Sequence, residues 1–110
     1  MTTQDAAFAI LSRHTTTGIQ LAVTGEIDMY TTGHLDRAIA EALRTDAGDL
    51  SVDLAATTFC DCAGITTLLA GRRDALAAHI GYQVSNPTGL PLKVLQTAGV
   101  HTLLTTAASC

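Results

Sequence analysis

The chain of 110 residues is 47% hydrophobic and 15% charged, and its net charge is −4. This length is typical of one compact domain, so we expect residues 1–110 to form a single domain. Nucleic-acid binding needs clustered cations, and the six Lys and Arg residues include only one adjacent pair, Arg72 and Arg73. A nucleic-acid partner is therefore not expected.

The same sequence-wide features indicate a cytoplasmic protein. No segment approaches the roughly 18 uncharged apolar residues that a membrane span needs, so no membrane partner is expected. The first residues lack the basic and apolar regions of a signal peptide. The three cysteines cannot all pair within the chain, which fits a reducing compartment.

A β-hairpin is predicted near the start of the chain. Residues 8–13 and 19–24 both have the composition of short strands. The polar residues 15–18 between them can form the turn. Residues 25–28 are then expected to be a polar break that ends the second strand.

Two long helices are predicted from apolar residues that recur with helical period. The first begins at about Thr32, with Thr31 or Thr32 as its N-cap. The second covers residues 62–79, with Asp61 as its N-cap and Gly81 as a left-handed stop. The predicted apolar stripe of the first helix is Leu35, Ala38, Ile39, Ala42 and Leu43. That of the second is Ile65, Leu68, Leu69, Leu76 and Ile80, interrupted by Arg72.

The second helix is flanked by two strand candidates, residues 50–54 and 82–85. A strand–helix–strand unit of this length predicts parallel strands. A short helix is predicted over residues 91–98, ended by Gly99, and residues 101–105 are expected to add a last strand. The elements together predict an α/β domain with a small mixed sheet and helices packed against it.

Three segments in this order resemble the STAS family. They are residues 21–28 (Leu-Ala-Val-Thr-Gly-Glu-Ile-Asp), residues 59–65 after the strand Val-Asp-Leu (Phe-Cys-Asp-Cys-Ala-Gly-Ile), and residues 94–100 (Val-Leu-Gln-Thr-Ala-Gly-Val). The best-known members of this family antagonise anti-sigma factors. The resemblance implies an α/β fold of STAS type, in which a small mixed β-sheet packs against about three to four helices.

The resemblance also implies a protein partner. Such proteins bind a serine kinase of the histidine-kinase-like ATPase class that holds a sigma factor, and binding makes the kinase release the sigma factor. We therefore expect an anti-sigma factor antagonist, a monomer or weak homodimer with no cofactor. An enzyme is not expected, because the sequence has no Gly-x-Ser-x-Gly elbow and no Gly-rich phosphate loop.

The residues that would contact the partner follow from the same resemblance. In the family, the acidic turn after the second strand lies beside the strand-to-helix junction, here residues 61–64. The outward face of the following helix, predicted to include Gly71, carries small residues that would let a partner approach closely. The implied partner-binding residues are Glu26, Asp28, Asp61, Cys62, Ala63, Gly64, Thr66, Thr67 and Ala70.

The usual phosphorylation switch of the family cannot operate at this junction. In the family, the kinase phosphorylates the hydroxyl residue immediately before the junction glycine, here Gly64, and a phosphatase reverses the reaction. The residue at that position is Ala63, which has no hydroxyl, and Cys62 replaces the preceding serine. Thr66 and Thr67 are the alternative hydroxyls.

Two alternatives to the simple antagonist stay open. The first is a structural or regulatory subunit of a larger signalling or lipid-transport complex. The second is a redox-controlled antagonist that pairs Cys60 or Cys62 with Cys110, because a helix N-terminus favours a thiolate at Cys62. Cys60 would otherwise be a small buried apolar residue. No metal site is predicted, since the Cys-x-Cys pair has no histidine at metal-ligand spacing.

Overall fold

The computed structural model describes residues 8–45 and 48–108. These residues form a five-stranded mixed sheet and four helices, which confirms the predicted α/β architecture. In chain order the elements are β1 (Ala9–His14), β2 (Gly18–Ile27), α1 (Thr32–Leu43), β3 (Asp49–Asp53), β4 (Thr57–Cys60), α2 (Cys62–Ala77), β5 (Tyr82–Ser85), α3 (Gly89–Thr97) and α4 (His101–Thr105).

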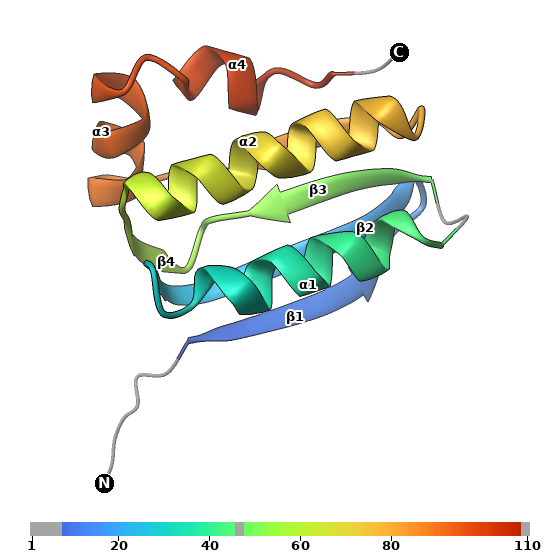
Figure 1. Ribbon diagram of the computed structural model, residues 1–110, viewed down its shortest axis with the longest axis horizontal. Helices are drawn as coiled ribbons and strands as arrows, with labels where there is room; N and C mark the ends of the chain where they lie inside the picture. The colour runs from blue at the N-terminus through green and yellow to red at the C-terminus, as the bar shows by residue number, and fades with distance from the viewer. Residues whose placement is uncertain (1–7, 46–47, 109–110) are drawn as a thin grey trace, which may run out of the picture.

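The strands are ordered β1-β2-β3-β5, and β4 pairs with the last residues of β2. The β1–β2 hairpin is antiparallel, and every other pairing is parallel, including β3 with β5 across α2. Both the predicted hairpin and the predicted parallel unit are thus confirmed. The carboxyl ends of β2 and β4 lie side by side, and α1 and α2 begin at this end of the sheet, on the left in Figure 1.

Helices α1 and α2 lie next to each other over one face of the sheet, and α3 and α4 lie beyond α2 (Figure 1). Leu21 and Val23 of β2 and Leu35 and Ile39 of α1 are buried in the same hydrophobic core. Burying one such side chain stabilises the fold by about 1.5–3 kcal/mol. The other large, fully buried side chains are Ile27, Val52, Leu54, Cys60, Leu68, Val84, Pro91, Leu95 and Leu104.

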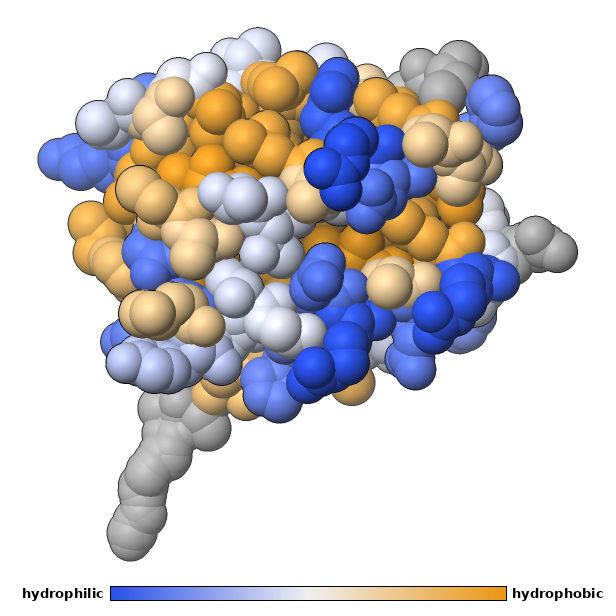
Figure 2. All heavy atoms as spheres, viewed as in Figure 1, coloured by the Kyte–Doolittle hydropathy of each residue, from blue (hydrophilic) through white to orange (hydrophobic). Residues whose placement is uncertain are grey.

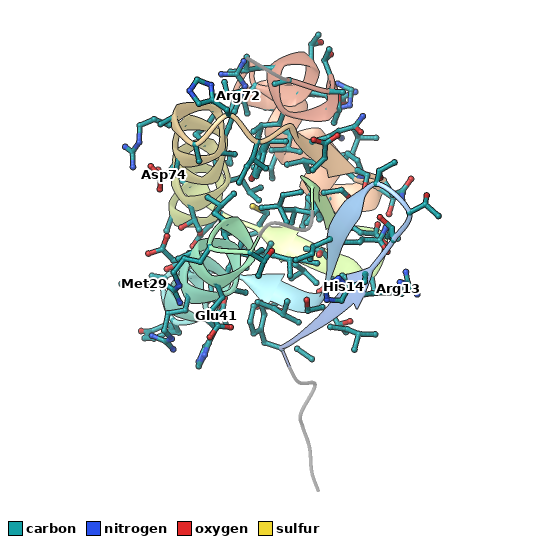
Figure 3. All side chains as sticks on the ribbon, turned by 90° about the vertical axis from the view of Figure 1, so that its right-hand side faces the viewer. Arg13, His14, Met29, Glu41, Arg72 and Asp74 are labelled. Carbon is teal, nitrogen blue, oxygen red and sulfur yellow. The ribbon has the colours of Figure 1, made fainter. Side chains whose placement is uncertain are left out.

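Helix α2 is buried more widely than a single stripe predicts. It packs against α1, β4, β5 and α4, and Figure 2 shows apolar surface, interrupted by hydrophilic side chains, on its exposed side. Ile65 and Leu68 of the predicted stripe are buried, but Gly71 and Ala75 are buried as well. Gly71, expected on the outward face, therefore faces the core. Arg72, which interrupts the stripe, lines a groove between α2 and α4 (Figure 3).

The ends of β2 and α2 differ from the sequence prediction. Residues 25–28 were expected to end the second strand. Instead, β2 continues to Ile27, because a register shift after Gly25 lets the strand pair with β4. Strand β4 itself was not predicted. The left-handed residue after α2 is His79, with φ of 60°, and not Gly81. Gly81 instead packs closely against the Asp49 carboxylate, since a Cβ there would lie 2.6 Å from Oδ1 of Asp49.

Residues 101–105 form helix α4, so the predicted last strand is wrong. Gly99, with φ of 77°, ends α3 as expected. A single further helical turn then carries Leu104 into the core, where it is 1% exposed. The neighbouring position beside β5 is filled by an antiparallel bridge between Tyr82 and Ala108.

Candidate functional site

The turn between β2 and α1 is held by reciprocal hydrogen bonds. Oδ1 of Asp28 accepts the backbone N–H groups of Tyr30 and Thr31 at 2.9 and 3.1 Å. The Thr31 hydroxyl donates to the carbonyl of Glu26 at 2.9 Å and accepts from the N–H of Asp28 at 2.8 Å. Thr31 occupies the N-cap position, but its side chain bonds backward to the turn and makes no capping bond to the helix.

The junction at residues 61–64 is held in the same manner. Asp61 is the N-cap of α2, as predicted, and its Oδ1 accepts the N–H of Gly64 at 2.9 Å. Its own N–H donates to the carbonyl of Ile27 at 3.1 Å. This last bond joins the junction to the end of β2. The acidic turn at Glu26 and Asp28 and the start of α2 therefore lie next to each other.

Gly64 makes this close approach possible. A Cβ at this position would lie 2.6 Å from Sγ of Cys60 and 2.8 Å from Cγ2 of Ile27. Both contacts are far inside van der Waals distance, so any larger residue would push α2 away from β2 and β4. The glycine of the junction is thus a packing requirement, and it fixes the direction in which α2 leaves the sheet.

The predicted partner-binding residues lie at this end of the sheet and along the first turns of α2. Glu26, Cys62 and Thr66 are exposed. Intermediate burial is found for Asp28, Asp61, Ala63, Thr67 and Ala70, whereas Gly64 is buried. The Thr66 hydroxyl donates to the carbonyl of Cys62 at 3.0 Å, and the Thr67 hydroxyl donates to that of Ala63 at 3.1 Å.

The two cysteines of the described residues are free thiols in different environments. Cys60 is buried, and this burial, with smaller contributions from the charges of Asp61 and Cys62, raises the pKa of its thiol to about 11. Its thiolate is therefore disfavoured at neutral pH. Cys62 is exposed at the start of α2. Cys110, the third predicted redox residue, lies outside the described residues.

Two grooves meet at Phe8, and the first of them includes residues of the acidic turn. One is lined by Thr24, Glu26, Asp28 and Thr31 on the far side of the acidic turn from α2. A larger groove of about 600 Å³ lies between β1 and α1, and Figure 3 shows two of its lining residues, His14 and Glu41, on these two elements. In residues 8–45 and 48–108, no three His, Cys, Asp or Glu side chains are grouped to hold a metal ion. Within the same ranges, no helix has the length and apolar character needed to cross a membrane.

These features describe a small α/β domain in which the acidic turn after β2 is bonded to the capped start of α2. The family model described as "Mlab, STAS domain" matches residues 10–105. The chain therefore belongs to this STAS-domain family. A search of curated proteins finds no match to the chain.

Solved anti-sigma factor antagonists share the fold. An anti-sigma factor antagonist from Mycobacterium paratuberculosis superposes with a TM-score of 0.78 at 23% sequence identity, covering 89% of this chain and 83% of that one. The antagonist SpoIIAA in its unphosphorylated form gives a TM-score of 0.70 at 20% identity, covering 91% and 86%. The phosphorylated form of SpoIIAA, a Bacillus cell fate determinant, gives 0.64 at 20% identity, covering 91% and 89%. The chain has the STAS fold.

Proposed function

We propose that the protein is an anti-sigma factor antagonist. In this proposal it binds a serine kinase of the histidine-kinase-like ATPase class and so frees the sigma factor that the kinase holds. The observation that carries the proposal is the bond of 3.1 Å from the Asp61 N–H to the Ile27 carbonyl. Because this bond joins the acidic turn to the junction, a partner that covers this end of the sheet would contact Glu26, Asp28 and the junction, on a chain whose family and fold are those of STAS domains.

The chemistry of this surface suits docking more than catalysis. Its exposed and half-buried groups are carboxylates, small side chains and one thiol, contributed by Glu26, Asp28, Asp61, Cys62 and Ala63. The carboxylates of Asp28 and Asp61 already accept backbone N–H groups, so they are fixed in place. A partner can reach the first turn of α2 without meeting a bulky side chain. Gly64 shapes this surface from below, and Thr66, Thr67 and Ala70 extend it along α2.

We propose further that phosphorylation of the junction does not release this antagonist from its kinase. Ala63 offers no hydroxyl where the family carries the phosphorylated residue. The hydroxyls of Thr66 and Thr67 already donate to helix carbonyls, and phosphorylation would remove those donors. The activity of the antagonist would then be set by another variable, such as its own concentration. This differs from a cycle driven by a kinase and a phosphatase.

The second candidate is a structural or regulatory subunit of a larger signalling or lipid-transport complex. The observation that favours it is again Ala63, because a subunit that is never released needs no phosphorylation site. This candidate uses the same protein-binding surface with a different partner. Under either proposal the chain acts as a single binding domain and carries out no catalysis.

The test is a pull-down from the native host with the wild-type protein and three variants. Ala63→Glu places a negative charge where the family carries phosphate, and an acidic residue in the first turn is compatible with helix stability. Asp61→Arg reverses the charge of the junction. Glu41→Arg makes the same change of charge on an exposed part of α1 away from the junction and is the control. Circular dichroism checks that all variants fold.

The proposed function predicts that the wild type and Glu41→Arg recover a kinase-like anti-sigma factor, and that Ala63→Glu and Asp61→Arg lose it. Recovery of transporter or signalling-complex subunits in its place would support the second candidate. A kinase that binds all four proteins equally would show that the docking surface lies elsewhere on the domain.

A further inference from the structure

The loop between β2 and α1 exposes two adjacent large side chains. Met29 is 68% exposed and Tyr30 is 82% exposed. Single exposed apolar residues are ordinary on protein surfaces, and Leu11 on β1 is one of them at 63%. Two neighbours at the tip of one turn are less common. Neither side chain belongs to the hydrophobic core or packs against it.

The backbone beneath this pair is fixed. Oδ1 of Asp28 accepts the N–H of Tyr30 at 2.9 Å, and the Thr31 hydroxyl donates to the Glu26 carbonyl at 2.9 Å. The two exposed side chains therefore project from a turn that is already ordered. Binding through them costs little additional backbone entropy, which is the general advantage of preorganised contacts.

The pair also lies beside the junction. Met29 and Tyr30 directly follow Asp28, and the preceding Ile27 accepts the bond from Asp61 that begins α2. Figure 3 shows Met29 at the outer surface on the side of the sheet covered by α1 and α2. Three carboxylates, those of Glu26, Asp28 and Asp61, belong to the same turn and to the junction that is bonded to it.

We propose that Met29 and Tyr30 are the apolar anchor of the docking surface. The kinase would receive them in a hydrophobic depression bordered by Lys or Arg side chains, which would complement the three carboxylates. Tyr and Met are enriched at protein interfaces, and a few buried aromatic anchors usually supply most of the binding energy. This inference rests on the proposed function, because it names the residues through which that function acts.

The test measures the affinity of the kinase recovered in the pull-down for purified variants. Tyr30→Ala and Met29→Ala are each expected to weaken binding by about tenfold or more. Tyr30→Phe should bind nearly as well as the wild type, since it keeps the ring. Leu11→Ala removes a comparably exposed side chain from β1 and should leave the affinity unchanged. The thermal midpoints of all four variants should match the wild type, because the side chains are exposed.

The Lys and Arg side chains proposed for the kinase are tested by the salt dependence of binding. The association rate constant of the wild type should fall as salt is raised, and Glu26→Gln should make that dependence shallower. Unchanged affinity in Tyr30→Ala and Met29→Ala, with the wild type binding the kinase, would overturn the anchor and leave the proposed function intact. An equal loss in Tyr30→Phe and Tyr30→Ala would overturn its apolar character. A wild-type protein that recovers no kinase would overturn both proposals.

Discussion

Asp28 and Asp61 have parallel roles at two neighbouring turns. Each carboxylate accepts backbone N–H groups at the start of a helix, Asp28 from the residues that lead into α1 and Asp61 from Gly64 in α2. The positive end of each helix dipole also favours a negative charge there. The two acidic groups of the proposed docking surface therefore stabilise the fold as well, and a substitution must separate these two effects.

Replacing Asp61 tests its capping role. Asp61→Ala removes the acceptor that lies 2.9 Å from the Gly64 N–H, and we expect it to lower the free energy of unfolding by about 1 kcal/mol. Asp61→Asn keeps an acceptor oxygen and should lose much less. Urea unfolding of both variants measures the difference. Equal losses would mean that the charge, and not the hydrogen bond, stabilises the start of α2.

The buried thiol of Cys60 makes the free energy of unfolding depend on pH in the alkaline range. Burial, with the charges of Asp61 and Cys62, raises the pKa of its thiol from the ordinary 9.0 to about 11. Between these two values the unfolded chain releases this proton and the folded protein keeps it. The free energy of unfolding therefore falls as the pH rises from 9.0 to about 11. Below pH 9.0 the thiol is protonated in both states, and none of this stability is lost.

We expect Cys60→Ala to remove this part of the alkaline dependence. Its free energy of unfolding, measured by urea titration across the same pH range, should fall less steeply than that of the wild type. Burial also raises the pKa of the Tyr82 hydroxyl, but Tyr82 is present in both proteins and affects both slopes. Identical slopes would contradict a buried, protonated thiol at Cys60.

At the scale of the elements, α2 depends on two glycines that let it approach its neighbours. Gly64 allows its first turn to contact Cys60 and Ile27. Gly71, two turns later, leaves room for Tyr82 of β5 and Ile39 of α1. Glycine lowers the intrinsic stability of a helix by about 1 kcal/mol relative to alanine, so both positions trade helix propensity for close packing.

Gly71→Ala tests whether close packing at this position outweighs the higher helix propensity of alanine. The added Cβ would lie 2.9 Å from Oη of Tyr82 and 3.0 Å from Cδ1 of Ile39, and we expect a loss of about 1–3 kcal/mol in the free energy of unfolding. Gly33→Ala in α1 is the matched control, because its nearest neighbour is an Arg37 side-chain nitrogen 3.8 Å away. Chemical denaturation should show this control unchanged or more stable. A destabilised control with a stable Gly71→Ala would contradict the packing argument.

At the scale of the whole molecule, Tyr82 connects three parts of the fold. Its hydroxyl donates to the Leu68 carbonyl of α2 at 2.9 Å, and its backbone pairs with Leu50 of β3 and with Ala108. Only 2% of the residue is exposed. The sheet, the helix layer and the C-terminal segment thus meet at one residue.

Tyr82→Phe keeps the ring and removes the hydroxyl bond. We expect the free energy of unfolding to fall by about 1 kcal/mol, the usual net value of one hydrogen bond. Tyr30→Phe, which changes an exposed tyrosine, should have no effect and serves as the control. Thermal unfolding followed by circular dichroism measures both. If Tyr82→Phe were as stable as the wild type, the hydrogen bond from the Tyr82 hydroxyl to the Leu68 carbonyl would make no net contribution to stability.

The sequence alone was sufficient wherever the signal is local. The stripe containing Leu35 and Ile39 predicts α1, because side chains three and four residues apart share a helix face. Asp61 predicts the start of α2, because its carboxylate reaches only the next few backbone N–H groups. The strand composition of residues 8–13 and 19–24, with the polar turn between them, predicts the hairpin. The STAS fold was implied by the resemblance of three segments to that family.

Tertiary contacts decided the remaining features. The extension of β2 through Gly25 depends on pairing with β4, which is more than thirty residues later in the chain. Gly71 is buried because Tyr82 and Ile39 meet it from other elements, and residues 101–105 become α4 because Leu104 fits the core. The joining of the acidic turn to the junction likewise needs the Asp61–Ile27 hydrogen bond. Local propensity determined α1, the start of α2 and the hairpin, whereas contacts between residues distant in the chain determined β4, α4 and how the ends of the elements meet, and the proposed docking surface lies at those ends.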